Sequence, residues 1–370
     1  MIAEKIHILH FVDTLGAGGT ERQLVYLLQN LDRERFESYV VTTYDDFRHY
    51  EEEIRRLQIA IYSLRHGELR VVNRSKAVAQ YIQLMWKLRP QIVHAWLHYP
   101  NLIARIARPF CPPHRLITAI RSNYSSRALA SEIRTQFFSD FRIVIKRKGS
   151  PEHYTNTHRP ITVIIPNGID HKFFKQSLQN NTPSENTFTV LMVARIDPRK
   201  DHQTLLKAIH LLHKDFPSKL KVILIGDITD LKTQQQINKT IAEYQLEMVI
   251  DQHTVTNNIL PYYLEANVSV LPSSSEEFPN VILESLATGT PAIVSEAANR
   301  GGLIQHRVSG WVFPTRDSLA LAHCLKAAWE TTDEQRKLMR EAGRSIAAEY
   351  SIEKMVEQYQ QLYERAVRRS

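Results

Sequence analysis

The order of apolar and amphipathic segments constrains the fold of this chain more than any other feature of the sequence. Short runs rich in valine and isoleucine alternate with longer segments of helical periodicity, which is the pattern of β-α units around a parallel sheet. In the first half, strands are predicted at residues 6–12, 39–42, 60–63, 92–95, 116–120, 143–145 and 162–165, with helices at 20–31, 75–88 and 101–108. After a polar segment at residues 176–187, strands are predicted at 188–193, 221–225, 249–251, 268–271 and 292–295.

Two domains follow from this restart and from the length of the chain. At 370 residues, the chain exceeds what one hydrophobic core usually supports. We therefore expect the α/β class with two Rossmann-like doubly wound domains, the first over residues 1–170 and the second over residues 171–350. Open sheets of this kind bind ligands beyond the carboxyl ends of their strands. The active site is expected in a cleft where two such edges face each other.

The distribution of charge along the chain indicates which kinds of partner the protein can bind. The net charge is +8, and residues 1–170 contain 24 Lys and Arg against 16 Asp and Glu, so the first half holds the whole excess. A basic face can meet nucleic acid, an anionic membrane or an acidic substrate. No nucleic-acid-binding motif is present, so nucleic acid is not expected. We expect an anionic membrane surface or lipid-linked acceptor, with contacts at residues 146–148 and 70–76; a merely solvated basic surface is the alternative.

The cellular compartment is predicted from three features. No apolar run approaches the about 18 residues of a membrane-spanning helix, and the first residues lack the pattern of a secretory signal. Cys111 and Cys324 fall one in each half and have no metal-ligand spacing. We expect reduced thiols in a cytoplasmic protein that is peripheral at the inner face of the plasma membrane.

A glycine-rich loop follows the first predicted strand. In FVDTLGAGGTERQL, Gly16, Gly18 and Gly19 precede a helix, where a glycine turn brings backbone amides close to a phosphate. The dinucleotide fingerprint would need glycine at position 21, which is Glu21. NAD is therefore disfavoured, and a plain tight turn into the helix is the alternative.

A basic loop opens the second domain. In VARIDPRKDHQTLLKAI, Arg195, Arg199 and Lys200 lie between a strand and a helix. Cations at that place add to the helix amides in holding a diphosphate. A solvated arginine loop is the alternative.

Two glutamates flank the start of a later helix. In SSSEEFPNVILESLATGTP, Glu276 precedes a helix that begins at Pro279, and Glu284 lies inside that helix. Carboxylates accept hydrogen bonds from vicinal diols. Glu284 is therefore expected to hold a ribose and Glu276 a sugar ring, whereas two surface acids are the alternative.

Together, GAGGTERQL, IPNGID at residues 165–170, VARIDPRKDHQTLLKAI and EEFPNVILESLATGTPAIVSE resemble the retaining glycosyltransferases of family 4, with the GT-B fold, over essentially the whole chain. The last stretch is the most specific, because it reproduces the E-x7-E element of that family with its Phe-Pro-Asn and later Gly-x-Pro. The resemblance implies that a helix within residues 351–370 packs back on the first domain and that IPNGID lies at the junction. The donor-binding residues that it implies are Gly18, Gly19, Arg195, Lys200, Glu276, Phe278, Pro279, Asn280 and Glu284.

Further candidates follow two strands of the first domain. In IVHAWLHYPNLIARIA, His94 and His98 lie at the end of a predicted strand, and the family often has a histidine near the reacting sugar. We favour His98 slightly over His94 as a catalytic residue beside Glu276; a structural histidine is the alternative for either. In TAIRSNYSS, Arg121 and Asn123 are candidates for an acceptor or donor phosphate, although loop polarity explains them nearly as well.

The resemblance implies a hexosyltransferase that moves a sugar from a nucleoside diphosphate sugar to a hydroxyl of a lipid-linked or cell-surface glycan, as in lipopolysaccharide or exopolysaccharide biosynthesis. It implies retention of configuration by front-face attack. No D-x-D occurs in the chain, so we expect neither a metal nor a cofactor. Glu277 replaces the glycine usual after the first acid of the family motif, which puts the identity of the donor sugar in doubt. A nucleotide-sugar epimerase of the same fold and a non-catalytic nucleotide-sugar-binding protein are the alternatives.

Overall fold

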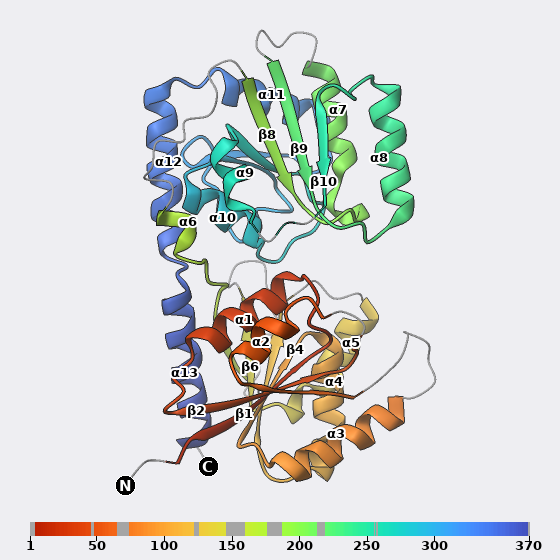
Figure 1. Cartoon of the computed structure of the whole chain (residues 1–370), viewed down its shortest axis with the longest axis vertical. Coiled ribbons are helices and arrows are strands. Elements are labelled where there is room, and N and C mark those ends of the chain that lie inside the picture. The colour runs from red at the N-terminus through yellow and green to blue at the C-terminus, as the bar shows by residue number, and fades with distance from the viewer. Residues whose placement is uncertain are drawn as a thin grey trace. The chain divides into compact units, whose positions relative to one another are not determined.

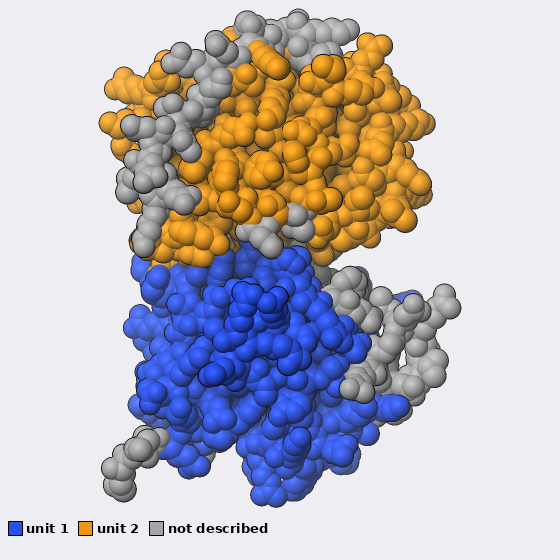
Figure 2. Space-filling model, viewed as in Figure 1, with its two compact units in different colours: residues 1–168, 352–370 blue, residues 169–351 orange. Residues whose placement is uncertain are grey.

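The computed structural model describes residues 4–45, 48–64, 74–121, 126–145, 160–175, 187–212, 219–254, 256 and 258–368. The chain forms two compact units (Figures 1 and 2), unit 1 from residues 1–168 with 352–370 and unit 2 from residues 169–351. Each unit contains a parallel sheet with helices, so the prediction of two Rossmann-like domains is confirmed. The unit boundaries differ from those drawn on the sequence by at most two residues.

The sheet of unit 1 has seven parallel strands in the order β3-β2-β1-β4-β5-β6-β7. Because the strand order reverses between β1 and β4, the carboxyl ends of these two strands mark the topological switch point, where such sheets bind ligands. The strands are β1 (Ile6–Val12), β2 (Phe36–Thr42), β3 (Ala60–Ser63), β4 (Ile92–Trp96), β5 (Arg115–Ile120), β6 (Phe141–Val144) and β7 (Ile161–Ile164).

Helices cover both faces of this sheet (Figure 1). They are α1 (Gly19–Asn30), α2 (Glu51–Arg56), α3 (Arg74–Leu88), α4 (His98–Ala107), α5 (Ser126–Thr135) and α13 (Ile352–Arg368). Successive residues of a strand point to opposite faces. Ile8 accordingly joins the core cluster under α1 and α13, whereas Leu9 joins the cluster under α3 and α4. No helix among the described residues is long and apolar enough to cross a membrane.

Helix α13 completes unit 1 although it comes from the end of the chain. Its buried residues follow the three- and four-residue spacing of one helix face, and they are Ile352, Met355, Val356, Tyr359, Leu362, Tyr363 and Ala366. The chain enters α13 close to Gly168, where an added Cβ would lie 2.8 Å from Ile352 Cα. Gln23 holds Gly168 from the other side, because its side-chain amide bonds both the N–H (2.8 Å) and the carbonyl (2.9 Å) of that glycine.

Two buried histidines lie beneath α13. His10 on β1 and His94 on β4 are both fully buried, and their ring centroids are 5.7 Å apart. The Tyr363 hydroxyl lies 2.8 Å from His94 Nδ1. Burial lowers the pKa of His10 to about 3, and burial, with the charges of His10 and Arg121, lowers the pKa of His94 well below its ordinary value. Both rings are therefore neutral in the folded protein at pH 7.

Acid is expected to destabilise unit 1 through these histidines. Below about pH 6.5 the unfolded chain binds protons that the buried rings do not, so the free energy of unfolding falls by up to about 1.4 kcal/mol per histidine and pH unit. The urea midpoint should be lower at pH 5.5 than at pH 7.5. His10→Gln should remove about half of this contribution, and an unchanged pH dependence in that variant would contradict the assignment.

The sheet of unit 2 has six parallel strands in the order β10-β9-β8-β11-β12-β13. Helix α7 contacts both α8 and α11, and α6, α9 and α12 each contact α10. The strands are β8 (Thr187–Val193), β9 (Lys219–Ile225), β10 (Ile250–His253), β11 (Val268–Leu271), β12 (Ala292–Ser295) and β13 (Gly310–Phe313), of which the sequence patterns missed β13. The helices are α6 (Lys172–Lys175), α7 (His202–Leu212), α8 (Leu231–Glu243), α9 (Leu260–Glu265), α10 (Asn280–Thr288), α11 (Ser318–Trp329) and α12 (Asp333–Ala348).

Candidate active site

The loops that follow β8 and β11 meet at the carboxyl edge of the unit 2 sheet. These strands are neighbours in the sheet, and the N–H of Ser274 donates to the Arg199 carbonyl (2.8 Å). Lys200 Nζ lies 2.5 Å from Glu276 Oε1, and both side chains are largely buried. The structure thus brings together two predicted residues from motifs that lie far apart in the sequence.

The two arginines of the basic loop differ from Lys200 in their surroundings. Arg199 is held by Asp197, whose carboxylate accepts from Nε (3.0 Å), Nη2 (2.8 Å) and the backbone N–H (2.9 Å) of Arg199. These bonds, with Arg199 as the main cause, lower the pKa of Asp197 to about 2. Arg199 therefore shapes the turn at Pro198–Lys200. Arg195 is exposed at the start of the same loop.

Helix α10 begins just after Glu276. Pro279 is its N-cap, in extended conformation, rather than its first helical residue, and no side chain caps this end. The first turn contains no acidic residue. Amides at an uncapped helix N-terminus, together with the helix dipole, favour an anion. Asn280, the first residue of α10, lies at that end.

Two residues of the E-x7-E element, Phe278 and Glu284, are buried rather than exposed to solvent. Glu284, in the second turn of α10, is 2% exposed, and the Tyr263 hydroxyl donates to its Oε2 (3.1 Å). Phe278 is also buried, and its ring packs against Tyr350 with centroids 5.3 Å apart. The structure therefore shows packing for Phe278 and a fixed carboxylate for Glu284. Their predicted contacts with a donor stay predictions.

In unit 1, His98 lies directly after a strained turn at the carboxyl end of β4. Leu97 has a φ of 72°, a conformation that costs a non-glycine residue about 1–3 kcal/mol and that clusters at functional sites. His98 is the first residue of α4. The predicted start of this helix at residue 101 was therefore wrong by three residues, because the strained turn at Leu97 starts it early.

A buried acid that the sequence patterns did not single out lies beside His98. Glu132 Oε2, on α5, is 3.9 Å from His98 Nδ1, and Ser131 Oγ is 3.4 Å from His98 Nε2. Glu132 also accepts from Arg105 Nη2 (2.6 Å), and both of these side chains are fully buried. Burial raises the pKa of Glu132, but the hydrogen bond of His98 and the charge of Arg105 outweigh it and leave this pKa lowered.

Arg105 is the centre of this buried network. Its guanidinium donates to Ser139 Oγ (2.7 Å), Thr135 Oγ1 (3.4 Å) and Thr118 Oγ1 (3.0 Å) besides Glu132. A planar guanidinium with several fixed partners holds a carboxylate in one orientation. The network therefore fixes the position of Glu132 relative to His98.

The prediction that His94 faces the active site from the end of its strand is wrong. His94 lies in the middle of β4 and is fully buried. Its ring packs on Trp96, with centroids 4.3 Å apart, and α13 covers it through Tyr363. The alternative of a structural histidine fits His94, which leaves His98 as the catalytic candidate in this segment.

Arg121 follows β5 directly and is buried. It is 7% exposed, and it donates to the Tyr359 hydroxyl (2.8 Å) and to Asn167 Oδ1. Its guanidinium lies 4.9 Å from the centroid of Trp96. These contacts tie Arg121 to α13, and its predicted contact with a phosphate stays a prediction. Asn123 lies outside the described residues.

The glycine loop leads from β1 to α1. Gly18 is the N-cap of α1, and Gly19 is its first residue. The N–H of Gly18 donates to the carbonyl of Gly16 (2.8 Å). The backbone of Gly18 is extended, with a φ of −99°, so the turn does not require glycine for its conformation. The predicted contact of Gly18 and Gly19 with the donor stays a prediction.

Asp13 is a second acid that the patterns did not single out. It follows β1 directly, and Thr43 Oγ1 donates to its Oδ1 (3.4 Å). Burial, and then the charge of Glu21, raise the pKa of Asp13 to about 7, although Thr43 and His98 act in the opposite direction. A raised pKa with a charged neighbour is typical of functional sites. An acid just past a central strand at the switch point is the signal that reading the sequence could have used.

Asp13→Asn is expected to stabilise the protein at pH 8. Folded Asp13 binds its proton more tightly than the unfolded chain does, so the free energy of unfolding of the native protein falls as pH rises from about 4 to 7, opposite to the effect of the histidines. The variant removes this loss and should be more stable by about 1 to 3 kcal/mol at pH 8, with no gain at pH 4. Urea unfolding at both pH values measures this. A gain that is equal at pH 4 and pH 8 would contradict the raised pKa.

Two protein-family models match this chain one after the other. The Glycosyltransferase Family 4 model matches residues 17–173, and the Glycosyl transferases group 1 model matches residues 173–346. The UDP-Gal:alpha-D-GlcNAc-diphosphoundecaprenol alpha-1,3-galactosyltransferase of Escherichia coli is 26% identical over 54% of this chain and 53% of that protein. An N-acetylgalactosaminyltransferase of Campylobacter jejuni, named for an N,N'-diacetylbacillosaminyl-diphospho-undecaprenol substrate, is 24% identical over 77% of this chain and 80% of that protein.

The chain spans about half the length of the first curated relatives it matches, for example 41% of the D-inositol 3-phosphate glycosyltransferase of Pseudarthrobacter chlorophenolicus. Among solved structures, Anabaena Alr3699/HepE in complex with UDP and glucose has a TM-score of 0.82 at 17% identity, over 96% of this chain and 99% of that chain. A glycosyltransferase from Rickettsia africae has a TM-score of 0.81 at 17% identity, over 99% of this chain and all of that chain. With the two family models in tandem over residues 17–346, this chain belongs to the group 1 glycosyltransferases of family 4 type, with the GT-B fold.

Proposed function

We propose that this protein transfers a sugar from a UDP-sugar to a hydroxyl of a lipid-linked or cell-surface glycan, with retention of configuration and without a metal. The observation that carries the proposal is the contact of Lys200 with Glu276 (2.5 Å) at the uncapped N-terminus of α10. A cation and helix amides suit a diphosphate, and an acid beside them suits sugar hydroxyls. The UDP donor is supported by the names of the E. coli relative and of the HepE complex.

The proposed chemistry has a donor part in unit 2 and an acceptor part in unit 1. Lys200, Arg195 and the α10 amides stabilise charge on the departing UDP, while Glu276 binds the transferred sugar and Glu284 the ribose. His98, held by Glu132, belongs to the acceptor part. In front-face attack, the acceptor oxygen bonds to the anomeric carbon as the bond to the diphosphate breaks. The leaving phosphate oxygen takes the acceptor's proton.

The acceptor is proposed from the names of two relatives. Both the E. coli and the C. jejuni relatives are named for sugars on undecaprenyl diphosphate. A lipid-linked saccharide places the reaction at the inner face of the plasma membrane, where the basic first half of this chain favours an anionic surface. Residues 146–148, and 70–73 of the second predicted contact, lie outside the described residues.

The test is a product analysis with purified protein. It is incubated with UDP-glucose, UDP-galactose, UDP-N-acetylglucosamine and UDP-N-acetylgalactosamine, each with and without N-acetylglucosaminyl-diphospho-undecaprenol, and each in the presence and in the absence of EDTA. Transfer with an α-linkage by NMR supports the proposal. An epimerised UDP-sugar formed without the acceptor would favour the epimerase, and binding with neither transfer nor hydrolysis would favour the binding protein. Loss of activity in EDTA would contradict independence of metal.

Glu284→Gln is expected to weaken nucleotide binding. The amide keeps the shape of the side chain but replaces a charge-assisted bond to a ribose hydroxyl, which costs about 1 to 2 kcal/mol and raises the UDP dissociation constant about tenfold. Calorimetry with UDP measures this, and Tyr263→Phe serves as a control for the hydroxyl that holds Glu284. Unchanged affinity in Glu284→Gln would assign Glu284 a structural role.

A further inference from the structure

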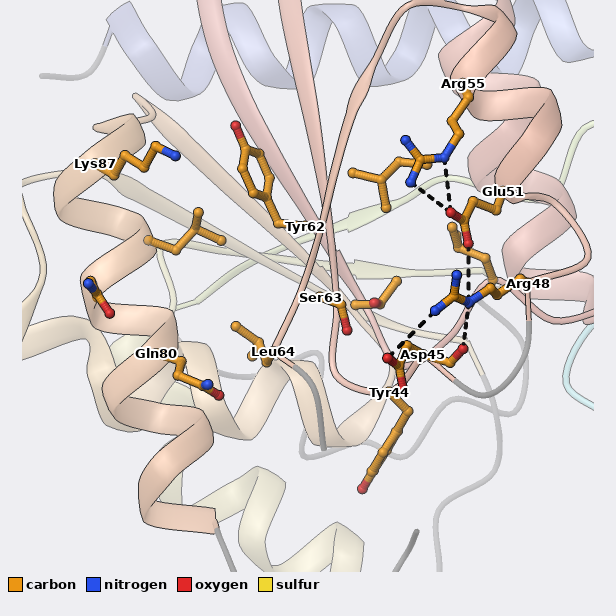
Figure 3. Close-up of a pocket in the computed structure, with 15 residues that line it drawn as sticks. Tyr44, Asp45, Arg48, Glu51, Arg55, Tyr62, Ser63, Leu64, Gln80 and Lys87 are labelled. Atoms are coloured by element: carbon orange, nitrogen blue, oxygen red, sulfur yellow. Dashed lines mark hydrogen bonds and ion pairs between the residues drawn. The ribbon is translucent and has the colours of Figure 1, made fainter. Parts of the chain in front are cut away.

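A cavity of about 700 Å³ lies in unit 1, apart from the residues assigned to the reaction. It opens among the carboxyl ends of β2 and β3 and the helices α2 and α3 (Figure 3). Its volume is within the range of small-molecule binding sites, which is about 300–1,000 Å³. Unlike most such sites, it is lined largely by polar side chains.

One wall is a row of alternating charges. Arg55 donates from Nε (2.9 Å) and Nη2 (2.7 Å) to Glu51 Oε1. Arg48 Nε lies 3.5 Å from Glu51 Oε2, and Arg48 Nη2 lies 3.6 Å from Asp45 Oδ2. Figure 3 shows these four side chains along one side of the cavity. Because each cation is matched by a carboxylate, this wall offers donors and acceptors side by side without a strong field of either sign.

The opposite wall is one face of α3. Gln80, Gln83, Leu84 and Lys87 line the cavity, at the spacing that places residues on the same side of a helix. The amide oxygen of Gln80 is buried, and it accepts no hydrogen bond from any described residue. A buried acceptor without a donor costs free energy. A hydroxyl or amide donor of a ligand would satisfy this oxygen once the Gln80 side chain turns it toward the cavity.

Between these walls lie apolar and aromatic groups. Tyr62, Ile61 and Leu64 come from β3 and the residue after it. A sugar ring combines an apolar C–H face with hydroxyl groups that both donate and accept. The two guanidiniums and two carboxylates of the charged wall offset each other. Lys87 is the further charged residue of the lining, and its Nζ lies 5.6 Å from the centroid of the Tyr62 ring. The lining is therefore complementary to a neutral carbohydrate.

Tyr44 connects the wall of the cavity with the segments that carry Asp13 and His98. Tyr44 lines the cavity, and the ring of Tyr44 stacks on Tyr99, the residue after His98, with centroids 6.2 Å apart and planes 19° apart. The N–H of Tyr44 donates to the carbonyl of Asp13 (2.9 Å). A ligand in the cavity therefore lies beside the segments that carry Asp13 and His98.

We propose that this cavity is a carbohydrate subsite that binds a sugar of the acceptor other than the one that receives the transferred sugar. The assignment rests on the proposed function for the identity of the acceptor, but not for the binding of sugar in the cavity. It gives Gln80, Gln83 and Tyr62 the role of selecting acceptors by their next sugar.

The test uses saturation-transfer NMR on the full-length protein with three neutral probes, methyl β-lactoside, methyl β-maltoside and N,N'-diacetylchitobiose. A saturation-transfer signal is expected for at least one probe. The double variant Gln80→Ala and Gln83→Ala should raise the dissociation constant of that probe about tenfold. Alanine favours the helix, so α3 should stay folded. Gln361→Ala, on the exposed face of α13, is the matched control and should bind as the native protein does.

Two outcomes would overturn the subsite. The first is that none of the three probes shows a saturation-transfer signal with the native protein. The second is that the double variant and the control bind the probe with equal affinity. Calorimetry with UDP on the same samples separates this inference from the proposed function. If the native protein does not bind UDP, the proposed donor site is contradicted and the sugar subsite is not. If the native protein binds UDP but none of the probes, only the subsite is contradicted.

Discussion

Lys200→Ala is expected to lower the turnover of sugar transfer by about two to three decades, the range for loss of one group that stabilises charge in the transition state. The ammonium of Lys200 lies 2.5 Å from Glu276 and is largely buried. Because charge builds on the departing diphosphate during the reaction, this cation should act more strongly on the transition state than on the bound substrate. The turnover number should therefore fall much more than the affinity for UDP.

A matched control is available on the following helix. Lys207 is exposed on α7, so Lys207→Ala removes the same charge from the same unit without touching the proposed site. Initial rates at saturating donor measure the effect in both variants, and circular dichroism checks their fold. Near-native turnover of folded Lys200→Ala would remove Lys200 from the site.

The second large effect is expected at Glu132. Glu132→Leu leaves the guanidinium of Arg105 buried without its carboxylate, and breaking one partner of a buried ion pair costs about 3–5 kcal/mol. This loss is measured by unfolding the protein in urea and monitoring unit 1 through the hydrogen exchange of peptides from α4 and β5. The double variant Arg105→Met and Glu132→Leu removes both charges and should recover much of the stability, because hydrophobic replacement of a buried pair is often neutral.

Glu132→Gln separates stability from the role at His98. The amide oxygen can still accept from Arg105, but the negative charge beside His98 is lost. If Glu132 positions His98 for the acceptor, the rate of transfer should fall in this variant while hydrolysis of the donor and affinity for UDP stay close to native. A parallel fall in hydrolysis and transfer would argue against that role.

Local sequence was sufficient for the donor part of the site. The strand, turn and helix that carry Glu276, Pro279 and Glu284 follow one another within a short segment, and α10 begins within one residue of the predicted place. The meeting of Lys200 with Glu276 also follows from the β-α pattern, because residues at the carboxyl ends of neighbouring parallel strands share one edge. The contact between Lys200 and Glu276 could therefore be predicted from the sequence.

The error at His94 and the unforeseen burial of Arg121 have a different cause. Both residues come next to polar or loop-like stretches, and both are covered by α13, which is more than 200 residues away in the chain. Glu132 was missed because its partner Arg105 lies on another helix. In each case a contact between distant segments decides burial, and the periodicity of one segment carries no information about that contact.

The place of α13 sets the order in which the two units can be completed during synthesis. Unit 2 is one uninterrupted stretch of the chain. A parallel β-bridge joins its first residue, Ile169, to its last residue, Ser351. Unit 1 needs Tyr359 and Tyr363 to close its core, and these residues follow the whole of unit 2 in the sequence. The usual order, in which the amino-terminal domain folds first, is therefore reversed. A nascent chain halted at residue 351 should contain a protease-resistant unit 2 beside an unfinished unit 1, so early chain termination would leave the basic half of this protein exposed to degradation.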